Sequence, residues 1–528
     1  MEPRQHLADS GPLVWTCAVI VLTLPWIWPF ATGPWPAAQQ AIITLACGGV
    51  LLLCLAGKHI ALARAVATSW LLAAGISSVL GLAQYLGLSP HFQPWMDATA
   101  LGEAFGNLRQ RNQFATLTNL GLAVLLWSPL SWHLTNQSVG RSDGERVVNQ
   151  LPVRVGILAL LFSVANAASA SRTGLLQLGA LAVLAIVWNR GFGRPAGRIL
   201  AVAGVGYLGA ALVLPLLVGL NPVDNGIGGR LRAEGLVCGR RSTLWANVLH
   251  LIARRPWSGW GWGELDYAHF MAEYTGPRFC EILDNAHNLP LHLAVELGLP
   301  LALAVCGLGL YLLWRGKPWR EQSAPRRMAW AALALILLHS MLEYPLWYGP
   351  FQLAFGLALW LLMSKSAPAR EATRDAGMPH QWRLAVAALG VAALSASGYA
   401  AWDYWRVSQI YTAPEARARA YMSNTLEKVS GSWLFANQVR FAELATTDLD
   451  TGNAAHMYVL SGELLHFSPE SRVVEKHIES ALLLGHDAVA QSYIARYKAV
   501  FPKEYAKWAA VRLFANPDEP AQGAPQAP

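Results

Sequence analysis

Long apolar segments alternate with short polar ones along the chain up to about residue 405. Eleven of them come close to the roughly 20 residues that a helix needs to cross about 30 Å of hydrocarbon. Because lipid offers no partners for backbone N–H and C=O groups, each segment is expected to be an α-helix. We place the segments at residues 13–30, 38–56, 65–87, 112–131, 152–168, 174–189, 198–220, 289–313, 327–343, 350–364 and 384–405.

Two stretches depart from this pattern and are expected to lie outside the membrane. The first is a loop from about 221 to 288. The second, 406–515, has a soluble composition with apolar residues at helical spacing, which predicts short helical hairpins of tetratricopeptide type, although no strict repeat is present. The expected domains are therefore a membrane domain over 1–405 that includes the loop, and an α-helical domain over 406–515. Residues 516–528 are rich in Pro, Ala and Gln and predict a disordered tail.

Composition supports a polytopic membrane protein. Hydrophobic residues make up 54% of the chain and charged residues 14%, whereas soluble domains carry roughly 25% charged residues. The mean hydropathy is +0.32. The net charge of +8 does not indicate a nucleic-acid partner, because the basic residues are dispersed among the loops between apolar segments, where they act as topology determinants.

The distribution of Lys and Arg predicts the orientation in the membrane. With the N-terminus inside, the inside segments hold eighteen Lys and Arg residues, whereas the short outside loops hold Arg109, Arg111 and Arg172. This asymmetry predicts a cytoplasmic N-terminus and, with eleven helices, a periplasmic loop and C-terminal region. We expect no cleavable signal peptide, since Arg4 is the only basic residue before the first apolar segment and no convincing cleavage site follows it.

Unusual polar motifs all fall on the face assigned to the outside, where they serve either as caps and interface anchors or as a working site at the water–lipid boundary. They are FGNLRQRNQFA (105–115), ASASRTG (168–174), the stretch 238–267 with RRSTLW and WSGWGWG, DNAHN (284–288) and LEYPLWYGPF (342–351).

Several arginines in these motifs are candidate anion ligands. Arg172 stands at a helix start beside hydroxyls and a glycine, where an anion is favoured; the alternative is that its side chain snorkels to the interface. Arg109 and Arg111 contact either a ligand or lipid headgroups. Of the pair Arg240 and Arg241, one is expected to be only solvated.

The aromatic and acidic candidates also have two interpretations. Trp260 and Trp262 either belong to an interfacial belt or supply stacking platforms for sugar rings. Glu343 and Tyr344 begin a short outward turn, where they either cap a helix or contact the substrate.

His287 is the sharpest candidate. An imidazole with an ordinary pKa of about 6.5 can bind a phosphate or exchange a proton with a hydroxyl; the alternative is a polar anchor at the mouth of a helix. His292 and Glu296 are four residues apart on one helical face, a spacing that also occurs in metal pairs. With no third ligand evident, we expect a buried hydrogen-bonded pair and no metal.

Cys238 and Cys280 share the outward loop. An oxidising compartment allows them to form a disulfide, and two reduced, packed thiols are the alternative. The other four cysteines lie within apolar segments and are expected to be packing residues.

The order of the motifs carries a family resemblance. RQRNQFAT, SASRTG, RSTLW with RRPWSGWGWG, FCEILDNAHNLPLHLAVELGLP and EYPLWYGPF closely resemble bacterial PglL-type protein O-oligosaccharyltransferases, which belong with O-antigen ligases and polymerases in one superfamily. The resemblance covers about residues 100–365, and the C-terminal region is similar to the extension of the protein-glycosylating branch. It implies an all-α, GT-C-like polytopic bundle in the bacterial inner membrane, with a periplasmic helical C-terminal region.

The resemblance also implies an activity. It is the transfer of an oligosaccharide en bloc from undecaprenyl pyrophosphate to a Ser or Thr hydroxyl of a periplasmic protein such as pilin, without a metal or other cofactor. The family's essential histidine corresponds to His287, its arginine four positions before a tryptophan to Arg241, and its SRT arginine to Arg172.

Other positions are less firmly assigned by the resemblance. A further loop arginine that contacts pyrophosphate corresponds to Arg278 or to one of Arg254 and Arg255. Additional candidates for contact with the lipid-linked glycan are Asn288, Arg109, Glu343, Tyr344, Trp260 and Trp262.

General chemistry agrees with this activity. Guanidinium groups at the outer interface would bind pyrophosphate bidentately and stabilise the leaving charge. His287 would assist the acceptor hydroxyl or bind phosphate, and direct displacement would invert the anomeric centre. The alternatives are ligation to lipid A core, polymerisation of O-antigen, and a lipid-linked sugar flippase, which would place its charged residues near the midplane. The outward C-terminal region favours a protein acceptor.

Overall fold

The structure is a computed structural model that describes residues 12–30, 33–57, 61–128, 152–189, 194–232, 237–364 and 379–515. Regular structure in these ranges is helical throughout, with no strand. The all-α fold expected from the sequence is therefore confirmed. The predicted disordered tail and part of the basic inside loops lie outside the described residues.

The chain folds into two compact units. Unit 1 comprises residues 1–234 and 309–402, and unit 2 comprises residues 235–308 and 403–528. The domains expected from the sequence grouped the loop with the apolar helices, whereas in the fold most of the loop packs with the C-terminal region. We describe each unit by itself.

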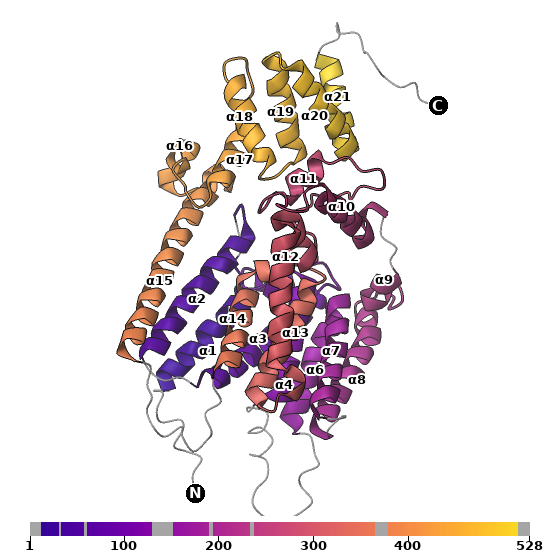
Figure 1. Ribbon diagram of the computed structural model, residues 1–528, viewed down its shortest axis with the longest axis vertical. Helices are drawn as coiled ribbons and strands as arrows, with labels where there is room; N and C mark the ends of the chain where they lie inside the picture. Colours follow the sequence, from indigo (N-terminus) through magenta and orange to yellow (C-terminus); the bar gives the residue numbers. More distant parts are fainter. Residues whose placement is uncertain are drawn as a thin grey trace, which may run out of the picture. The chain divides into compact units, whose positions relative to one another are not determined.

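Unit 1 is a bundle of apolar helices (Figure 1). It also contains η2 (Ser89–Phe92) and η3 (Gly106–Leu108) between α3 and α4, η6 (Pro318–Arg320) and η7 (Pro345–Trp347). Two of its helices, α12 and α15, continue into unit 2. Its α-helices are α1 (Pro12–Ile27), α2 (Pro36–Gly57), α3 (Leu62–Tyr85), α4 (Arg111–Trp127), α6 (Val153–Ala168), α7 (Arg172–Asn189), α8 (Arg194–Leu217), α9 (Gly226–Arg232), the later part of α12 (Leu289–Gly316), α13 (Ala324–Ser340), α14 (Gly349–Met363) and most of α15 (His380–Ser408).

Each of the eleven predicted segments overlaps one of these helices. Among the described residues, α2, α3, α8, α12 and α15 are long and apolar enough to cross a membrane. Four shorter helices, α1, α6, α7 and α14, are apolar as well. The chain is thus a polytopic membrane protein, and eleven crossings remain an expectation.

Small residues let the helices of unit 1 approach closely, as is usual where lipid provides no hydrophobic drive between helices. A Cβ added at Gly81 of α3 would lie 2.4 Å from the Phe114 ring of α4. At Gly206 of α8 it would lie 2.5 Å from Ser163 Oγ of α6. These contacts hold α3, α4, α6 and α8 against one another.

Unit 2 combines the outward loop with short helices from the end of the chain. The consecutive helices α17 to α21 pack on one another in pairs (Figure 1), as expected for helical hairpins. Its elements are η5 (Val237–Gly239), α10 (Arg241–Arg254), α11 (Leu265–Met271), the first part of α12, the end of α15, η8 (Gln409–Tyr411), η9 (Pro414–Ala416), η10 (Arg419–Tyr421), α16 (Thr425–Val429), α17 (Ala436–Thr446), α18 (Ala454–Leu465), α19 (Ser471–Leu483), α20 (Asp487–Val500) and α21 (Pro502–Ala515).

Helix α11 explains why the loop belongs to unit 2. Phe270 is 2% exposed and shares a core with α17 to α20. At the same place His466 Nδ1 lies 2.7 Å from Glu264 Oε2, and its ring stacks on Tyr267 at 3.8 Å between centroids. Arg496 of α20 donates to the carbonyl of Met271. Apolar, polar and ring contacts thus join α11 to the C-terminal helices.

Candidate active site

Helix α10 connects the arginine motif to the histidine motif. Arg241 is its first residue, and Trp245 lies one turn further on the same face. The Trp245 indole Nε1 donates to the carbonyl of Ala286 at 3.1 Å. Because Ala286 precedes His287 in the chain, this bond attaches the arginine-led helix to the DNAHN segment one residue before the histidine.

Two asparagines shape the chain around His287. The Asn285 carboxamide, 3% exposed, accepts the His287 N–H at 2.8 Å. This turn holds the half-buried His287 at φ 49°, a conformation that non-glycine residues seldom adopt. Asn288 Oδ1 accepts the Leu291 N–H at 3.2 Å and caps α12. Asp284 is exposed beside them and interacts electrostatically with His287.

A break in α12 receives the Trp/Gly-rich loop. Pro300 has no N–H to donate to the Glu296 carbonyl. The Glu296 carbonyl accepts the Gly261 N–H instead, at 3.0 Å. Similarly, the Trp260 N–H reaches the Val295 carbonyl at 2.9 Å, because the Leu299 N–H donates to Pro256 rather than to Val295.

Glycine is required on both sides of this junction. Gly298 has φ 82°, and a Cβ there would lie 2.2 Å from the Trp257 carbonyl oxygen. At Gly259 it would lie 2.2 Å from the Glu296 carbonyl oxygen. The inserted loop therefore sets the bend in the helix that carries Asn288 at its start.

The two candidate tryptophans differ in their surroundings. Trp260 donates its indole N–H to the Leu251 carbonyl at 3.0 Å, and Arg255 lies over its ring at 4.2 Å. These contacts favour a structural role for Trp260. Trp262 is 65% exposed, and its ring lies edge-to-face with His292 at 6.2 Å between centroids, so its stacking on a sugar stays a prediction.

His292 and Glu296 form a buried pair, each 2% exposed, with Nε2 and Oε2 3.4 Å apart. Glu296 Oε1 also accepts the Gly263 N–H at 3.1 Å, so the carboxylate fastens the inserted loop. In the described part of the chain no group of three or more His, Cys, Asp or Glu residues could hold a metal ion.

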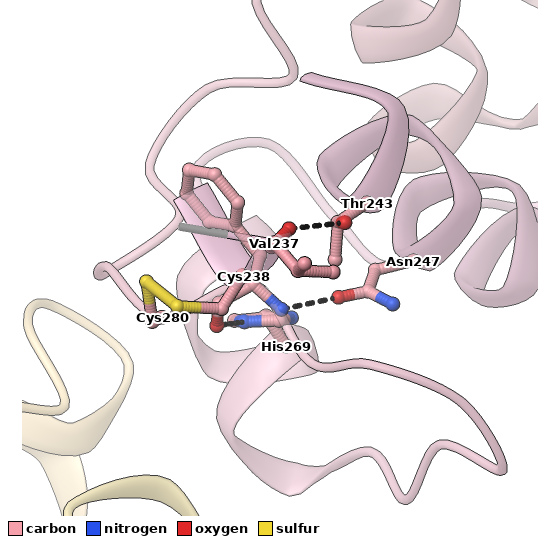
Figure 2. Close-up of a disulfide and its surroundings, with 7 residues drawn as sticks. Val237, Cys238, Thr243, Asn247, His269 and Cys280 are labelled. Atoms are coloured by element: carbon pink, nitrogen blue, oxygen red, sulfur yellow. Dashed lines mark hydrogen bonds between the residues drawn. A yellow bond between two sulfur atoms is a disulfide. The ribbon is translucent and has the colours of Figure 1, made fainter. Parts of the chain in front are cut away.

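Cys238 and Cys280 form a disulfide, with 5.2 Å between their Cα atoms (Figure 2). Asn247 of α10 binds the segment that leads to Cys280. Its Oδ1 accepts the Phe279 N–H at 2.8 Å, and its Nδ2 donates to the Pro277 carbonyl at 3.1 Å. The disulfide and this amide thus fasten the segment before DNAHN to the start of α10.

Arg278 is engaged by backbone carbonyls. Its guanidinium donates to Ala272 at 2.9 Å, to Phe270 at 3.3 Å and to His269. These are carbonyls at the C-terminal end of α11, where a cation is favoured. Burial lowers the pKa of Arg278 from its ordinary value. The arrangement favours a structural role over contact with pyrophosphate, and leaves Arg254 and Arg255 as the other loop candidates.

His269 and Asp266 are buried titratable groups that the sequence did not single out. His269 Nε2 lies 3.1 Å from the Phe279 carbonyl and therefore donates to it, so Nδ1 accepts from Tyr274 OH at 2.8 Å. Burial, with Arg278 nearby, lowers the pKa of His269 to about 4. Burial also raises the pKa of Asp266, 7% exposed, to about 7, and the charge of Asp284 adds to the rise. The sequence signal that could have revealed Asp266 is an acidic residue next to apolar residues in the short helix α11.

In unit 1, the SRTG motif begins α7. Ser171 Oγ accepts the Gly174 N–H at 2.9 Å and caps the helix, and Arg172, its first residue, is exposed. Asn112 of α4 accepts from the same Ser171 hydroxyl at 2.6 Å and donates to Glu343 Oε1 at 3.1 Å. Asn112 therefore links the Arg172 helix to Glu343, a connection that the sequence did not reveal.

Glu343 and Tyr344 lie at the end of α13. The Glu343 carboxylate is 8% exposed and also receives Gln110 Nε2 at 3.4 Å. Tyr344 stacks on Tyr348 with 6.0 Å between ring centroids. Both were predicted to contact substrate or to cap a helix. In the structure Glu343 accepts from two side-chain amides, and its contact with substrate stays a prediction.

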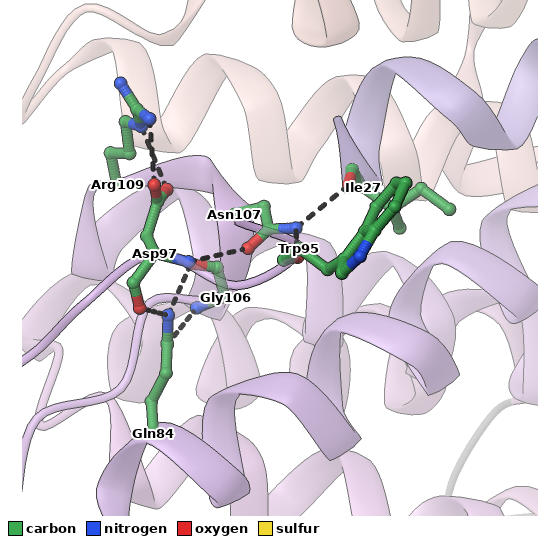
Figure 3. Close-up of polar contacts among 7 residues, drawn as sticks. All are labelled: Ile27, Gln84, Trp95, Asp97, Gly106, Asn107 and Arg109. Atoms are coloured by element: carbon green, nitrogen blue, oxygen red, sulfur yellow. Dashed lines mark hydrogen bonds and ion pairs between the residues drawn. The ribbon is translucent and has the colours of Figure 1, made fainter. Parts of the chain in front are cut away.

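Arg109 lies in a separate polar cluster of unit 1 (Figure 3). Its Nε and Nη2 donate to the two carboxylate oxygens of Asp97 at 2.9 and 2.8 Å. The buried Gln84 donates to the carbonyls of Asp97 and Gly106 at 3.0 and 2.9 Å. Asn107 donates to the Ile27 and Trp95 carbonyls, both at 3.0 Å. This network favours a structural role for Arg109.

The predicted site residues therefore fall into groups. In unit 2, the helix that begins at Arg241 is attached through Trp245 to the segment that holds His287 and Asn288. In unit 1, Arg172 and Glu343 are connected through Asn112. Trp260, Arg278 and Arg109 make contacts that favour structural roles, and their predicted contacts with the donor remain predictions.

Three family models match successive parts of the chain. Residues 104–127 match the protein glycosylation ligase model, residues 157–306 the O-antigen ligase model, and residues 327–514 the C-terminal model of virulence factor membrane-bound polymerases. The DNAHN motif, α10 and the disulfide all lie within the O-antigen ligase match.

A relative in Acinetobacter baylyi (strain ATCC 33305 / BD413 / ADP1), a general O-oligosaccharyltransferase, is 26% identical over 128 residues. The match covers 24% of this chain and 22% of the relative. The family models and this relative together confirm the resemblance found in the motifs, and support a PglL-type protein of the O-antigen ligase superfamily.

Proposed function

We propose that the chain is a glycosyltransferase that moves an oligosaccharide en bloc from undecaprenyl pyrophosphate to Ser or Thr hydroxyls of periplasmic proteins such as a pilin. The observation that carries the proposal is the hydrogen bond from Trp245 to Ala286. It joins a helix that begins with Arg241 to the residue before His287. The proposed pyrophosphate-binding arginine and the proposed proton acceptor therefore belong to segments that contact each other, which supports glycan transfer from a lipid pyrophosphate.

In the proposed reaction the acceptor oxygen forms a bond to the anomeric carbon, while the bond from that carbon to the pyrophosphate oxygen breaks. The electron pair of the broken bond leaves with undecaprenyl pyrophosphate, and the anomeric centre inverts. His287 takes the proton of the acceptor hydroxyl, which is a weak nucleophile without a base. Arg241 stabilises the charge that develops on the leaving pyrophosphate.

Asn285 supports this role of His287. Its carboxamide holds the His287 backbone in the turn, so the imidazole begins from a defined position, and a preorganised base needs no rearrangement during the reaction. Arg172, exposed at the start of α7, is a further proposed ligand of the donor. Arg172, Trp262 and Tyr344 offer exposed or partly exposed groups for this role.

We further propose that the chain lies in the bacterial inner membrane with its N-terminus in the cytoplasm and the candidate site and C-terminal region in the periplasm. Two observations support this orientation. The Lys and Arg residues favour one side of the membrane, as positive-inside topology requires. The disulfide lies in the loop assigned to the other side, and disulfides persist in the oxidising periplasm.

A second candidate function is ligation of the glycan to lipid A core. It is favoured by the match of residues 157–306 to the O-antigen ligase model, which covers both Arg241 and His287. The protein glycosylation ligase match at 104–127 and the oligosaccharyltransferase relative favour a protein acceptor.

The purified protein should be incubated with undecaprenyl-pyrophosphate-linked oligosaccharide and offered pilin or lipid A core in separate reactions. Mass spectrometry then measures the glycan on each acceptor. We expect glycan on the pilin Ser or Thr residues. Transfer only to lipid A core would favour the ligase, and consumption of the donor without either product would contradict both functions.

A further inference from the structure

The proposed reaction leaves one apolar surface unexplained, in the SGSWLF turn between α16 and α17 (residues 430–435). Trp433 in this turn is 77% exposed and Leu434 is 41% exposed. Their neighbours in the chain, Ser432 and Phe435, are buried at 5% and 4% exposure. The turn thus buries two residues and projects the two apolar residues between them.

The turn is tied to the end of α15 by a buried carboxylate. Asp403, 0% exposed, accepts the Ser432 hydroxyl at 2.9 Å and the Leu434 N–H at 3.3 Å. Arg406, one turn further along α15, donates to the same carboxylate at 2.7 Å. A charge so deeply buried is costly unless it is paired and hydrogen-bonded, so these partners hold each other in place.

A ring contact strengthens the attachment. Phe435 packs edge-on against Tyr404 of α15, with 5.2 Å between ring centroids. Trp433 is therefore flanked by residues that bind consecutive positions of one helix, Asp403 and Tyr404. These contacts hold Trp433 beside the Asp403–Tyr404 part of α15.

The position matters because α15 lies in one of the candidate membrane spans, His380–Tyr411, and its apolar sequence ends at about residue 405. Asp403 lies five residues before the end of α15 at Ser408, or about 8 Å along the axis at 1.5 Å per residue. Trp433 is thus held at the level where α15 leaves the hydrocarbon.

A second exposed indole occurs at this level. Trp405 of α15 is 48% exposed, and Tyr421 packs against its ring at 5.7 Å between centroids. One exposed tryptophan on a soluble surface needs no explanation. Two at the exit of a spanning helix, one of them held there by Asp403, fit the interfacial region, where a large ring with one polar N–H is most favourable.

We propose that Trp433 and Leu434, together with Trp405, form a membrane-interface anchor that seats the start of the C-terminal region in the lipid headgroup layer. The occupant of this surface is the bilayer itself. Its continuity with α15 favours lipid over a second copy of the chain or a protein partner. The anchor does not depend on the proposed glycan transfer.

The test uses the full chain in nanodiscs of phosphatidylethanolamine and phosphatidylglycerol. Cys17, Cys47, Cys54 and Cys306 are first replaced by alanine, and an environment-sensitive fluorophore is attached at Trp433→Cys. Lipids that carry a spin-label quencher near the headgroup should quench this fluorophore strongly and its emission should be blue-shifted. The same label at Val459→Cys, another exposed apolar position at 59% exposure in α18, is the control and should remain accessible to a water-soluble quencher.

Further variants keep the test decisive. Leu434→Cys provides a second labelling position if the first variant does not elute as a monodisperse protein. Ser432→Ala removes one hydrogen bond to Asp403 and should weaken the quenching of the label at 433 by lipid. A label at 433 that only the aqueous quencher reaches would overturn the proposal. So would protection of the label that depends on dimer formation in detergent, and unchanged lipid quenching in Ser432→Ala would overturn the role of Asp403.

Discussion

Asn285 illustrates how a single side chain shapes the candidate site. Its carboxamide replaces a backbone partner for the His287 N–H and makes a positive φ acceptable at a histidine. The DNAHN motif, read alone, suggested a histidine between two amides with a polar function. The structure separates the amides by task, since Asn285 forms the turn and Asn288 caps α12. Residue type predicted the motif, but the two roles depend on backbone geometry.

Arg241 provides the most specific test at this scale. Arg241→Lys should reduce glycan transfer by on the order of 10- to 100-fold, because a point charge cannot reproduce a bidentate contact with pyrophosphate. Arg240→Lys is the matched control. Arg240 is exposed and precedes the helix, so its variant should transfer glycan nearly as the wild type does. Initial rates at saturating acceptor measure both, and the reverse order of sensitivity would show that the arginine has been misassigned.

Asp266 predicts a pH dependence of stability. Its pKa in the folded protein is raised to about 7 by burial and by the charge of Asp284. A raised pKa means that the folded state holds the proton more tightly, so this stabilisation is present at low pH and is lost as pH rises through about 7. The unfolding free energy of the wild type should therefore fall by on the order of a few kcal/mol between about pH 4 and pH 7. Asp266→Asn cannot ionise, so this fall should be absent in the variant. Equal slopes for the two proteins in denaturant titrations would refute this role.

At the scale of elements, helices were predictable and their interruptions were not. Apolar length located a helix in all eleven predicted segments, because lipid leaves the backbone few alternatives. The helix predicted at 174–189 begins two residues earlier, at Arg172. The apolar pattern missed this first turn because Arg172 and Thr173 are polar. The glycines of WSGWGWG were noted only as part of a tryptophan motif. Their function appears only when the loop meets the break in α12, a contact between distant segments.

Gly298 tests that junction. Gly298→Ala places a Cβ 2.2 Å from the Trp257 carbonyl oxygen at a φ of 82°, so the loop must withdraw from α12 and its backbone hydrogen bonds are lost. We expect destabilisation of more than about 2 kcal/mol and a large loss of transfer.

Gly307→Ala in the same helix is the matched control, because a Cβ there meets nothing within 4 Å. Alanine favours a helix by about 1 kcal/mol over glycine, so this variant should be neutral or slightly stabilised. Thermal unfolding in detergent compares the two proteins. A Gly298→Ala protein as stable as Gly307→Ala would mean that the inserted loop is not fixed.

At the scale of the whole molecule, the sequence predicted a helical C-terminal region but not its association with the loop that precedes α12. Both pieces were recognised as extramembrane from their composition. The association depends on Phe270, which pattern alone could not distinguish from any other aromatic residue in a short helix. In the structure it is buried among α17 to α20, and the DNAHN loop and the C-terminal helices form one unit.

Phe270→Ala should therefore loosen both pieces together. Truncation of a buried Phe costs about 3–5 kcal/mol, and limited proteolysis should cut residues 237–288 and the C-terminal helices with similarly increased rates. Phe92→Ala is the control, since Phe92 is 51% exposed and surface substitutions usually change stability by less than about 0.5 kcal/mol. Increased cutting in only one of the two pieces would contradict a shared unit.

The central claim is that His287, beside the helix led by Arg241, deprotonates the acceptor in glycan transfer. The most direct measurement is single-turnover transfer from undecaprenyl-pyrophosphate-linked oligosaccharide to pilin by the wild-type protein and by His287→Ala, at equal amounts of folded, membrane-inserted protein. We predict that the variant still binds the lipid-linked donor but transfers glycan at least about 100-fold more slowly, since it lacks the general base. Transfer by His287→Ala at a rate close to that of the wild type would contradict the account.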